Sequence, residues 1–196
     1  MIRKNQINCN LIQLKSLTKS IFRKSMKSFR VESELCPSCK RKGDCRIHGY
    51  YHRFVIDFCS GTPIVSRLKI TRVRCSCGRT HAILPDPIIP YASYSLVFIR
   101  KVLSAYYSHH QTIENICSAF GITPSMLYRW KRLFKDHCLE WKGIVTAASV
   151  APETLLNEIS HLPLNDLSHS FFLLTGISFM QSHKNPALLH RTAPPP

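Results

Sequence analysis

The spacing of hydrophobic and polar positions changes once along the chain, from a strand pattern to a helical one. In residues 53–58 an apolar Phe or Ile stands at every second position, which is typical of a β-strand. Residues 60–63, Ser-Gly-Thr-Pro, then signal a turn, and residues 64–73 are rich in β-branched side chains. We therefore predict a β-hairpin in this part of the chain.

From residue 93 onward the apolar residues recur at helical spacing. A first helix is predicted over about Ser93–His109, and its apolar face carries Leu96, Ile99, Leu103, Tyr106 and Tyr107. A short helix after Thr112 and a longer one from Pro124 are predicted on either side of Gly121. Weaker patterns predict a helix at residues 152–160 and another apolar segment at 167–180.

These patterns divide the chain into four parts and predict the α+β class. Residues 1–34 form a basic N-terminal arm, flexible or a frayed helix; a nucleic-acid-binding arm and an organellar transit peptide are the alternatives. Residues 35–84 contain the hairpin, and three prolines stiffen the connection to a helical domain at 91–143. Residues 144–196 are a partly helical segment, and its Pro-rich end at 191–196 is expected to be disordered.

Charge adds a class of partner to this picture. The formal net charge is +16, and it is uneven: residues 1–142 hold 25 Lys/Arg and 8 Asp/Glu, whereas residues 143–196 hold 2 and 3. A surface this basic attracts polyanions, of which nucleic acid is the commonest. Charge alone leaves an anionic membrane or an acidic protein open as alternatives, but no segment is long and apolar enough to span a bilayer.

Cysteine usage indicates a metal rather than disulfides. The chain has 9 cysteines, an odd number, and four of them stand in two tight pairs. Met1 to Phe29 has basic residues every few positions and no uninterrupted apolar core, so we expect no signal peptide and a reducing, cytoplasmic setting. Paired cysteines in such a setting are typical of metal sites.

The two pairs have the composition of a zinc ribbon. Cys36 and Cys39 form a C-x2-C pair, and Cys75 and Cys77 form a shorter C-x-C pair followed by Gly78. Zinc prefers four thiolates in a tetrahedron, and the two ends of one hairpin supply them at little ordering cost. We predict a structural zinc ion bound by these four cysteines, and its binding energy supports folding of the ribbon.

Several neighbouring residues could replace a member of the shorter pair. The candidates are Cys45, His48, Cys59 and His81, the last of which stands four residues after Cys77. The other interpretations of the cysteine pairs are free buried cysteines and a redox C-x2-C site. A redox site requires its cysteines after a strand at the start of a helix, which is not the pattern here.

The segment 112–135 has the pattern of a helix-turn-helix. Thr112 is a suitable N-cap, Gly121 a suitable stop in the left-handed conformation, and Ile122 an apolar plug in the turn. Thr123 then caps a second helix whose first residue is Pro124. Two short helices around a glycine turn are the signature of this motif.

The second helix of this segment has an apolar arc and a polar one. A recognition helix buries one side and presents hydrogen-bonding side chains to bases and phosphates on the other. The predicted DNA-contacting residues are Ser125, Tyr128, Arg129 and Arg132, with Lys131 and Lys135 flanking the phosphate backbone. The alternative is an amphipathic helical hairpin whose basic face is only solvated.

These motifs together resemble a known family. The CPSC pair at 36–39, the run RVRCSCGRTH at 72–81 and the sequence LYRW at 127–130 are similar to the N-terminal part of bacterial insertion-sequence transposases. They resemble even more closely short, uncharacterised transposase-like bacterial proteins that share the ribbon and the run THAILP at 80–85. The resemblance covers about residues 35–143, and more faintly 172–186. It implies recognition of a specific DNA end or site.

One departure from those transposases bears on catalysis. Full-length members continue into a nuclease domain in which three carboxylates hold two divalent metals. Only Glu153, Glu158 and Asp166 follow the helix-turn-helix here, in a segment too short for such a domain. We therefore expect a protein without transposition chemistry.

The function expected from the sequence is non-catalytic, zinc-dependent DNA binding, related to the DNA-recognition part of a transposase. An RNA-binding or protein-interaction zinc module is the alternative, and an enzyme is a third for which the sequence shows no nucleophile–base pair or phosphate loop. The expected partner is double-stranded DNA. A separate transposase and a homodimer are left open, no membrane partner is expected, and the expected location is the bacterial cytoplasm, at the nucleoid.

Overall fold

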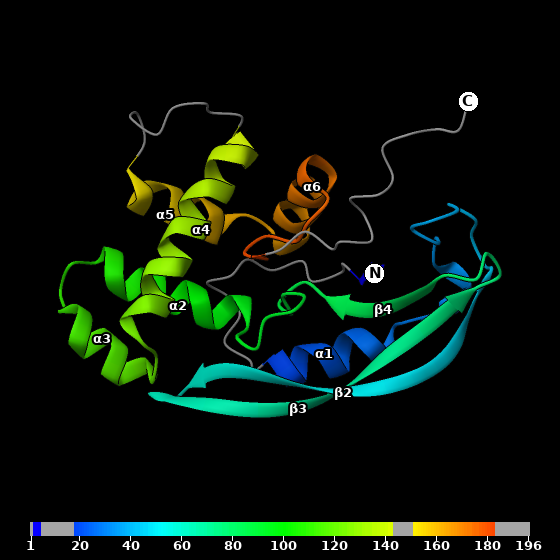
Figure 1. Ribbon diagram of the computed structural model, residues 1–196, viewed down its shortest axis with the longest axis horizontal. Helices are drawn as coiled ribbons and strands as arrows, with labels where there is room; N and C mark the ends of the chain where they lie inside the picture. Colours follow the sequence, from blue (N-terminus) through cyan, green and yellow to red (C-terminus); the bar gives the residue numbers. More distant parts are fainter. Residues whose placement is uncertain (1, 5–17, 143–150, 183–196) are drawn as a thin grey trace.

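The computed structural model describes residues 2–4, 18–142 and 151–182, and it has an α+β fold, which confirms the predicted class (Figure 1). A long β-hairpin meets the helices at its turn, and its open end extends away from them. In chain order the elements are β1 (Ile2–Lys4), α1 (Thr18–Lys27), the 3-10 helix η1 (Val31–Ser33), β2 (Cys45–Cys59), β3 (Thr62–Cys75), β4 (Thr80–Pro85), α2 (Leu96–Tyr107), α3 (Ile113–Phe120), α4 (Pro124–Lys142), α5 (Pro152–His161) and α6 (Leu164–Thr175).

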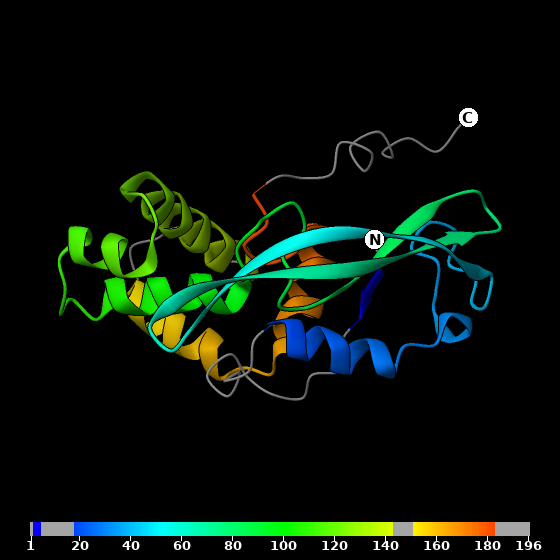
Figure 2. The ribbon, with the colours of Figure 1, turned by 90° about the horizontal axis from the view of Figure 1, so that it is seen from below.

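The sheet has the strand order β1-β4-β3-β2. β2, β3 and β4 are antiparallel, and the short β1 runs parallel to β4. The hairpin register pairs Cys59 with Thr62 at the turn and Cys45 with Cys75 at the far end, so the predicted hairpin is confirmed and is longer than the pattern indicated. Seen from below, its two strands twist around each other along their length (Figure 2).

A polar contact with α1 accounts for a buried acidic residue on β2. Val55 and Asp57 are buried, whereas Phe54 is 58% exposed. The carboxylate of Asp57 accepts hydrogen bonds from the backbone N–H of Thr18 at 2.8 Å and from its hydroxyl at 2.6 Å. A carboxylate at a helix N-terminus satisfies free N–H groups and the helix dipole, so Asp57 faces inward although it is charged.

Helix α1 is part of the folded body. Its Ile21 and Phe22 are buried, and Phe22 packs in a cluster with Val55, Leu68 and Ile70 of the hairpin. The N-terminal arm, expected over residues 1–34 to be flexible or a frayed helix, therefore contains a packed helix. Residues 5–17 of that arm lie outside the described residues.

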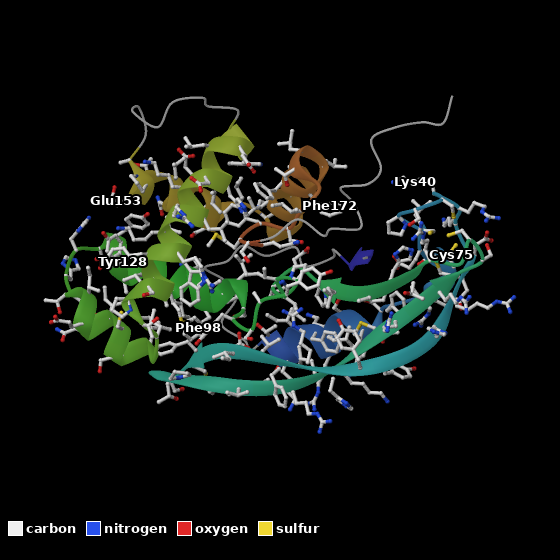
Figure 3. The ribbon with its side chains drawn as sticks, viewed as in Figure 1. Lys40, Cys75, Phe98, Tyr128, Glu153 and Phe172 are labelled. Atoms are coloured by element: carbon white, nitrogen blue, oxygen red, sulfur yellow. The ribbon has the colours of Figure 1, made fainter. Side chains whose placement is uncertain are left out.

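The turn end of the hairpin packs into the hydrophobic core of the helices. Phe98 of α2 is fully buried at its centre, in contact with the rings of Phe58, Phe120 and Trp130 (Figure 3). The backbone joins the two parts as well, because Ile56 of β2 exchanges hydrogen bonds of 2.7 and 3.0 Å with the segment just before α2. The helical core therefore includes residues from both sides of the predicted boundary between residues 84 and 91, and two smaller clusters lie along the hairpin.

The C-terminal segment docks on the helices through α5 and α6. Leu155 and Ile159 of α5 and Leu167 and Phe171 of α6 are buried in the same core cluster. The helix predicted at 152–160 is confirmed, and the expected disordered end at 191–196 lies outside the described residues. Within the described residues, none of the helices combines the length and apolar character needed to cross a bilayer.

Stability is expected to fall below pH 6.5 because of one buried histidine. His137 of α4 accepts the backbone N–H of Met180 through Nδ1 at 3.0 Å, and burial lowers its pKa to about 4. Histidine has a pKa of about 6.5 in the unfolded chain, so His137 is neutral in both states above that pH and the fold has its full stability. About 3 kcal/mol of this stability is lost as the pH falls from there towards 4, because only the unfolded chain binds the proton readily. Urea unfolding of the wild type and His137→Gln at several pH values measures it. Identical pH slopes would contradict the assignment.

Candidate metal centre and the helical pair

Four cysteines converge at the far end of the hairpin. The sulfur atoms of Cys36, Cys39, Cys75 and Cys77, here termed the cysteine cluster, all lie within 4.8 Å of one another. Two of the separations, Cys36 to Cys77 and Cys39 to Cys75, are 3.8 and 3.6 Å. Four sulfurs about 2.3 Å from a zinc ion form a tetrahedron with edges of about 3.8 Å, so the cluster has the dimensions of a four-thiolate metal site.

Backbone turns hold each cysteine pair in place. In the first pair, the N–H of Cys36 donates to the carbonyl of Arg41 at 3.0 Å, and Lys40 takes a left-handed φ of 62° as the chain reverses. In the second pair, the N–H of Cys75 donates to the carbonyl of Arg79 at 2.9 Å, and Gly78 has a φ of 82°. Gly78 adopts this conformation without a steric penalty because it has no side chain.

Asp44 links the two turns, a role that no pattern in the sequence indicates. Its carboxylate accepts a hydrogen bond of 2.9 Å from the hydroxyl of Ser76 and pairs with Arg41 at 3.2 Å. Its backbone carbonyl accepts the N–H of Ser76 at 3.1 Å. The contact joins residues 32 positions apart, so only the folded hairpin shows it.

Backbone N–H groups favour the thiolate form of two cysteines in the cluster. The backbone N–H of Arg41 lowers the pKa of Cys39 to about 6, and that of Cys77 lowers the pKa of Cys75. The N–H of Arg79 also acts to lower the pKa of Cys77, but burial and the neighbouring sulfurs outweigh it and raise that pKa to about 11. Four such groups ionise together only when a cation balances their charge, and the thiolate is the form that binds a metal.

The alternative ligands named from the sequence lie outside this set of four. His81 is buried on β4, and its Nε2 lies 3.3 Å from the sulfur of Cys36, where it can hydrogen-bond a ligand sulfur. Burial lowers the pKa of His81 to about 4 and favours the neutral ring. Cys45 is buried opposite Cys75, and desolvation raises its pKa to about 12. His48 is exposed, and Cys59 lies at the other end of the hairpin.

The helical pair forms around Gly121 as the sequence predicted. The hydroxyl of Thr112 accepts the N–H of Asn115 at 3.3 Å at the start of α3, and Gly121 ends that helix with φ 61° and ψ 42°. Ile122 is buried in the turn, and Thr123 caps α4 through the N–H of Met126 at 3.3 Å. Each cap satisfies a backbone donor that the helix leaves free.

The structure places the predicted DNA-contacting residues on the outer side of α4, with one exception. Leu127, Trp130 and Phe134 are buried in the core. The exposed residues are Ser125, Tyr128, Arg129, Arg132 and Lys135. Lys131 is half-buried instead, because its ammonium group donates to the hydroxyl of Tyr106 and lies 3.9 Å from the centre of that ring.

The cysteine cluster and the outer side of α4 lie at opposite ends of the molecule, as the labelled Cys75 and Tyr128 show in Figure 3. Residues 36–130 match the family model of a domain of unknown function, DUF6431. The matched segment begins at the first cysteine of the cluster and ends inside α4, so it includes the cluster, the hairpin and the turn at Gly121. No curated protein and no solved structure matches the chain.

Proposed function

We propose that this protein is a non-catalytic, zinc-dependent protein that binds double-stranded DNA at specific sites, related to the DNA-recognition part of a transposase. The observation that carries the proposal is the outer side of α4. There the exposed Ser125, Tyr128, Arg129, Arg132 and Lys135 follow a glycine turn and a short first helix. A helix exposed in this way can enter the major groove, where arginine pairs with guanine.

The order of the two helices supports a helix-turn-helix. Helix α3 has 8 residues and α4 has 19, and the buried Ile122 packs in the turn between them. The N-terminal part of the second helix reads bases in this motif, and Ser125, Tyr128 and Arg129 lie in the first two turns of α4. The RNA-binding alternative gains no support from this geometry, because the narrow major groove of duplex RNA does not admit side chains.

Zinc is the metal proposed for the cysteine cluster. Four thiolates at tetrahedral spacing suit zinc better than calcium or magnesium, which prefer oxygen ligands. Its role is structural, because four protein ligands leave no open position for substrate or water. Zinc therefore fixes the end of the hairpin whose other end packs on the helices.

We propose no strand-cleavage chemistry for this chain, which makes a separate transposase a candidate partner alongside the DNA. A homodimer would fit a target site made of two half-sites. The corresponding location is the bacterial cytoplasm, in contact with the nucleoid.

Two substitutions on α4 test the recognition side. Arg129→Ala is expected to reduce the magnitude of the binding free energy for the preferred site by about 1–3 kcal/mol and for other duplexes by much less. The reason is that an arginine that contacts bases distinguishes one DNA sequence from another. Lys135→Ala is expected to weaken binding to all duplexes alike, because Lys135 contacts phosphate. The slope of log affinity against log salt concentration is expected to fall in magnitude by about 1. Fluorescence anisotropy on preferred and scrambled duplexes measures both. Equal losses on every sequence for both variants would contradict the proposal.

A further inference from the structure

Two arginines lie directly opposite each other near the cysteine cluster. Arg46 of β2 is the register partner of Arg74 of β3, and both are exposed and line one hollow. Like charges directly across an antiparallel pair repel each other and destabilise the sheet. Among the described residues that line this hollow the acid is Asp44, which is already bonded to Ser76 and Arg41. An external anion would therefore relieve the repulsion.

The same face of the sheet leads from this pair to an aromatic groove. Arg72 stands two positions before Arg74, and its guanidinium donates a hydrogen bond of 3.1 Å to the hydroxyl of Thr80. Thr80 is the β4 partner of Arg74 and lines a groove of about 490 Å³. Tyr51 and Tyr91 line this groove as well, and its volume lies in the range of small-ligand clefts, about 300–1,000 Å³.

The tyrosines of the groove are placed for contact with a ligand. Tyr91 is 73% exposed and has a left-handed φ of 61°, a conformation that costs energy in a residue with a side chain. Burial raises the pKa of Tyr51, and the charges of Arg53 and Arg72 oppose that shift, so two guanidinium groups lie near its hydroxyl. Aromatic rings and guanidinium planes are the groups on which unpaired bases stack.

Gly49 leaves open space between the arginine pair and the groove. It is the register partner of Arg72, just after a bulge at Ile47, and a Cβ atom added to it would meet no atom within 4 Å. Its backbone is not left-handed, so the conformation does not require glycine. A glycine inside a strand weakens the strand and often marks the close approach of a ligand.

We propose that this face, from the Arg46–Arg74 pair to Tyr51 and Tyr91, binds a single strand of nucleic acid. Phosphates of the strand lie against Arg46, Arg72 and Arg74, and an unpaired base stacks in the groove. A duplex keeps its base faces covered, so the aromatic groove favours a single strand over a second duplex. This surface is separate from α4, and it does not depend on the duplex binding proposed above.

Anisotropy of a labelled oligothymidylate of about 12 nucleotides, titrated with the full-length zinc-loaded protein, tests the surface. Tyr91→Ala is expected to weaken binding about 5- to 150-fold through the loss of stacking on one base. Gly49→Val is expected to weaken it too, because the new side chain fills the space beside Arg72, while thermal stability does not fall and duplex binding stays unchanged. Wild-type affinity in both variants would overturn the proposal.

A matched pair of arginine variants separates this surface from general positive charge. Arg67 is exposed on the opposite face of β3, so Arg67→Ala removes the same charge as Arg74→Ala from the other side. Only Arg74→Ala is expected to weaken oligothymidylate binding, with a salt slope lower by about 0.7. Equal losses in both would overturn the proposal. Arg129→Ala, measured on duplex in parallel, tests the α4 proposal alone.

Discussion

Replacing Cys75 with serine is expected to abolish stoichiometric metal binding and to unfold the cysteine end of the hairpin. Cys75 is 2% exposed, its sulfur lies 3.6 Å from that of Cys39, and its strand position pairs it with Cys45. Structural zinc sites contribute about 10–16 kcal/mol of binding energy in small peptides, and this energy supports folding. Little apolar core is available at this end to replace it, because its buried cluster consists of three cysteines, Val73 and Ile83.

Mass spectrometry measures the zinc content of the variant. The amide NMR signals of residues 36–48 and 72–81 show whether the cysteine end of the hairpin is folded. Cys59→Ser is the matched control, because Cys59 lies at the opposite end of the hairpin and outside the cluster. A chelator is expected to produce the same unfolding in the wild type and little further change in Cys75→Ser. One zinc ion retained per chain at wild-type affinity in Cys75→Ser would show that other residues are the ligands.

Phe98→Ala is expected to lower the free energy of unfolding by about 3–5 kcal/mol, the usual cost of removing a buried phenylalanine. Phe98 is 0% exposed, and its ring centre lies 6.0 Å from that of Phe58 on the hairpin and 5.8 Å from that of Phe120. It therefore connects β2 to the first helix of the pair. The free energy of unfolding of small domains is only about 5–15 kcal/mol, so this loss would be a large fraction of the total stability.

Urea unfolding of the wild type and Phe98→Ala measures the loss, with Leu173→Ala as control because Leu173 is 70% exposed on α6. The turn end of the hairpin and the helices are expected to unfold together in the wild type, because Phe98 packs against rings from both. A loss below about 1 kcal/mol, within the range of surface substitutions, would contradict the central position given to Phe98.

The parts of the fold that sequence predicts well are those set by local chemistry. Gly121 stops α3 because glycine can adopt the left-handed conformation. Pro124 starts α4 because its fixed φ suits the first position of a helix. Cys36 and Cys39 lie shortly before the first strand of the hairpin, and the other two cysteines lie at the end of the second strand. Their convergence therefore follows once the turn near Gly61 is recognised. These features needed no knowledge of distant contacts.

The remaining features depend on contacts between distant residues. The alternating pattern suggested an apolar face containing Phe54, but Phe54 is 58% exposed, whereas Asp57 is buried because it binds the start of α1, 39 residues earlier. Lys131, predicted to flank DNA, is held by Tyr106 from the neighbouring helix. The Arg46–Arg74 pair follows from a register that no local pattern specifies.

Selection from a pool of random duplexes with full-length, zinc-loaded protein tests whether the protein recognises a specific DNA site. We expect the wild type to enrich a defined sequence and Arg129→Ala to lose this enrichment. A pool that stays random after repeated rounds at low salt, with metal bound and the protein folded, would contradict this expectation.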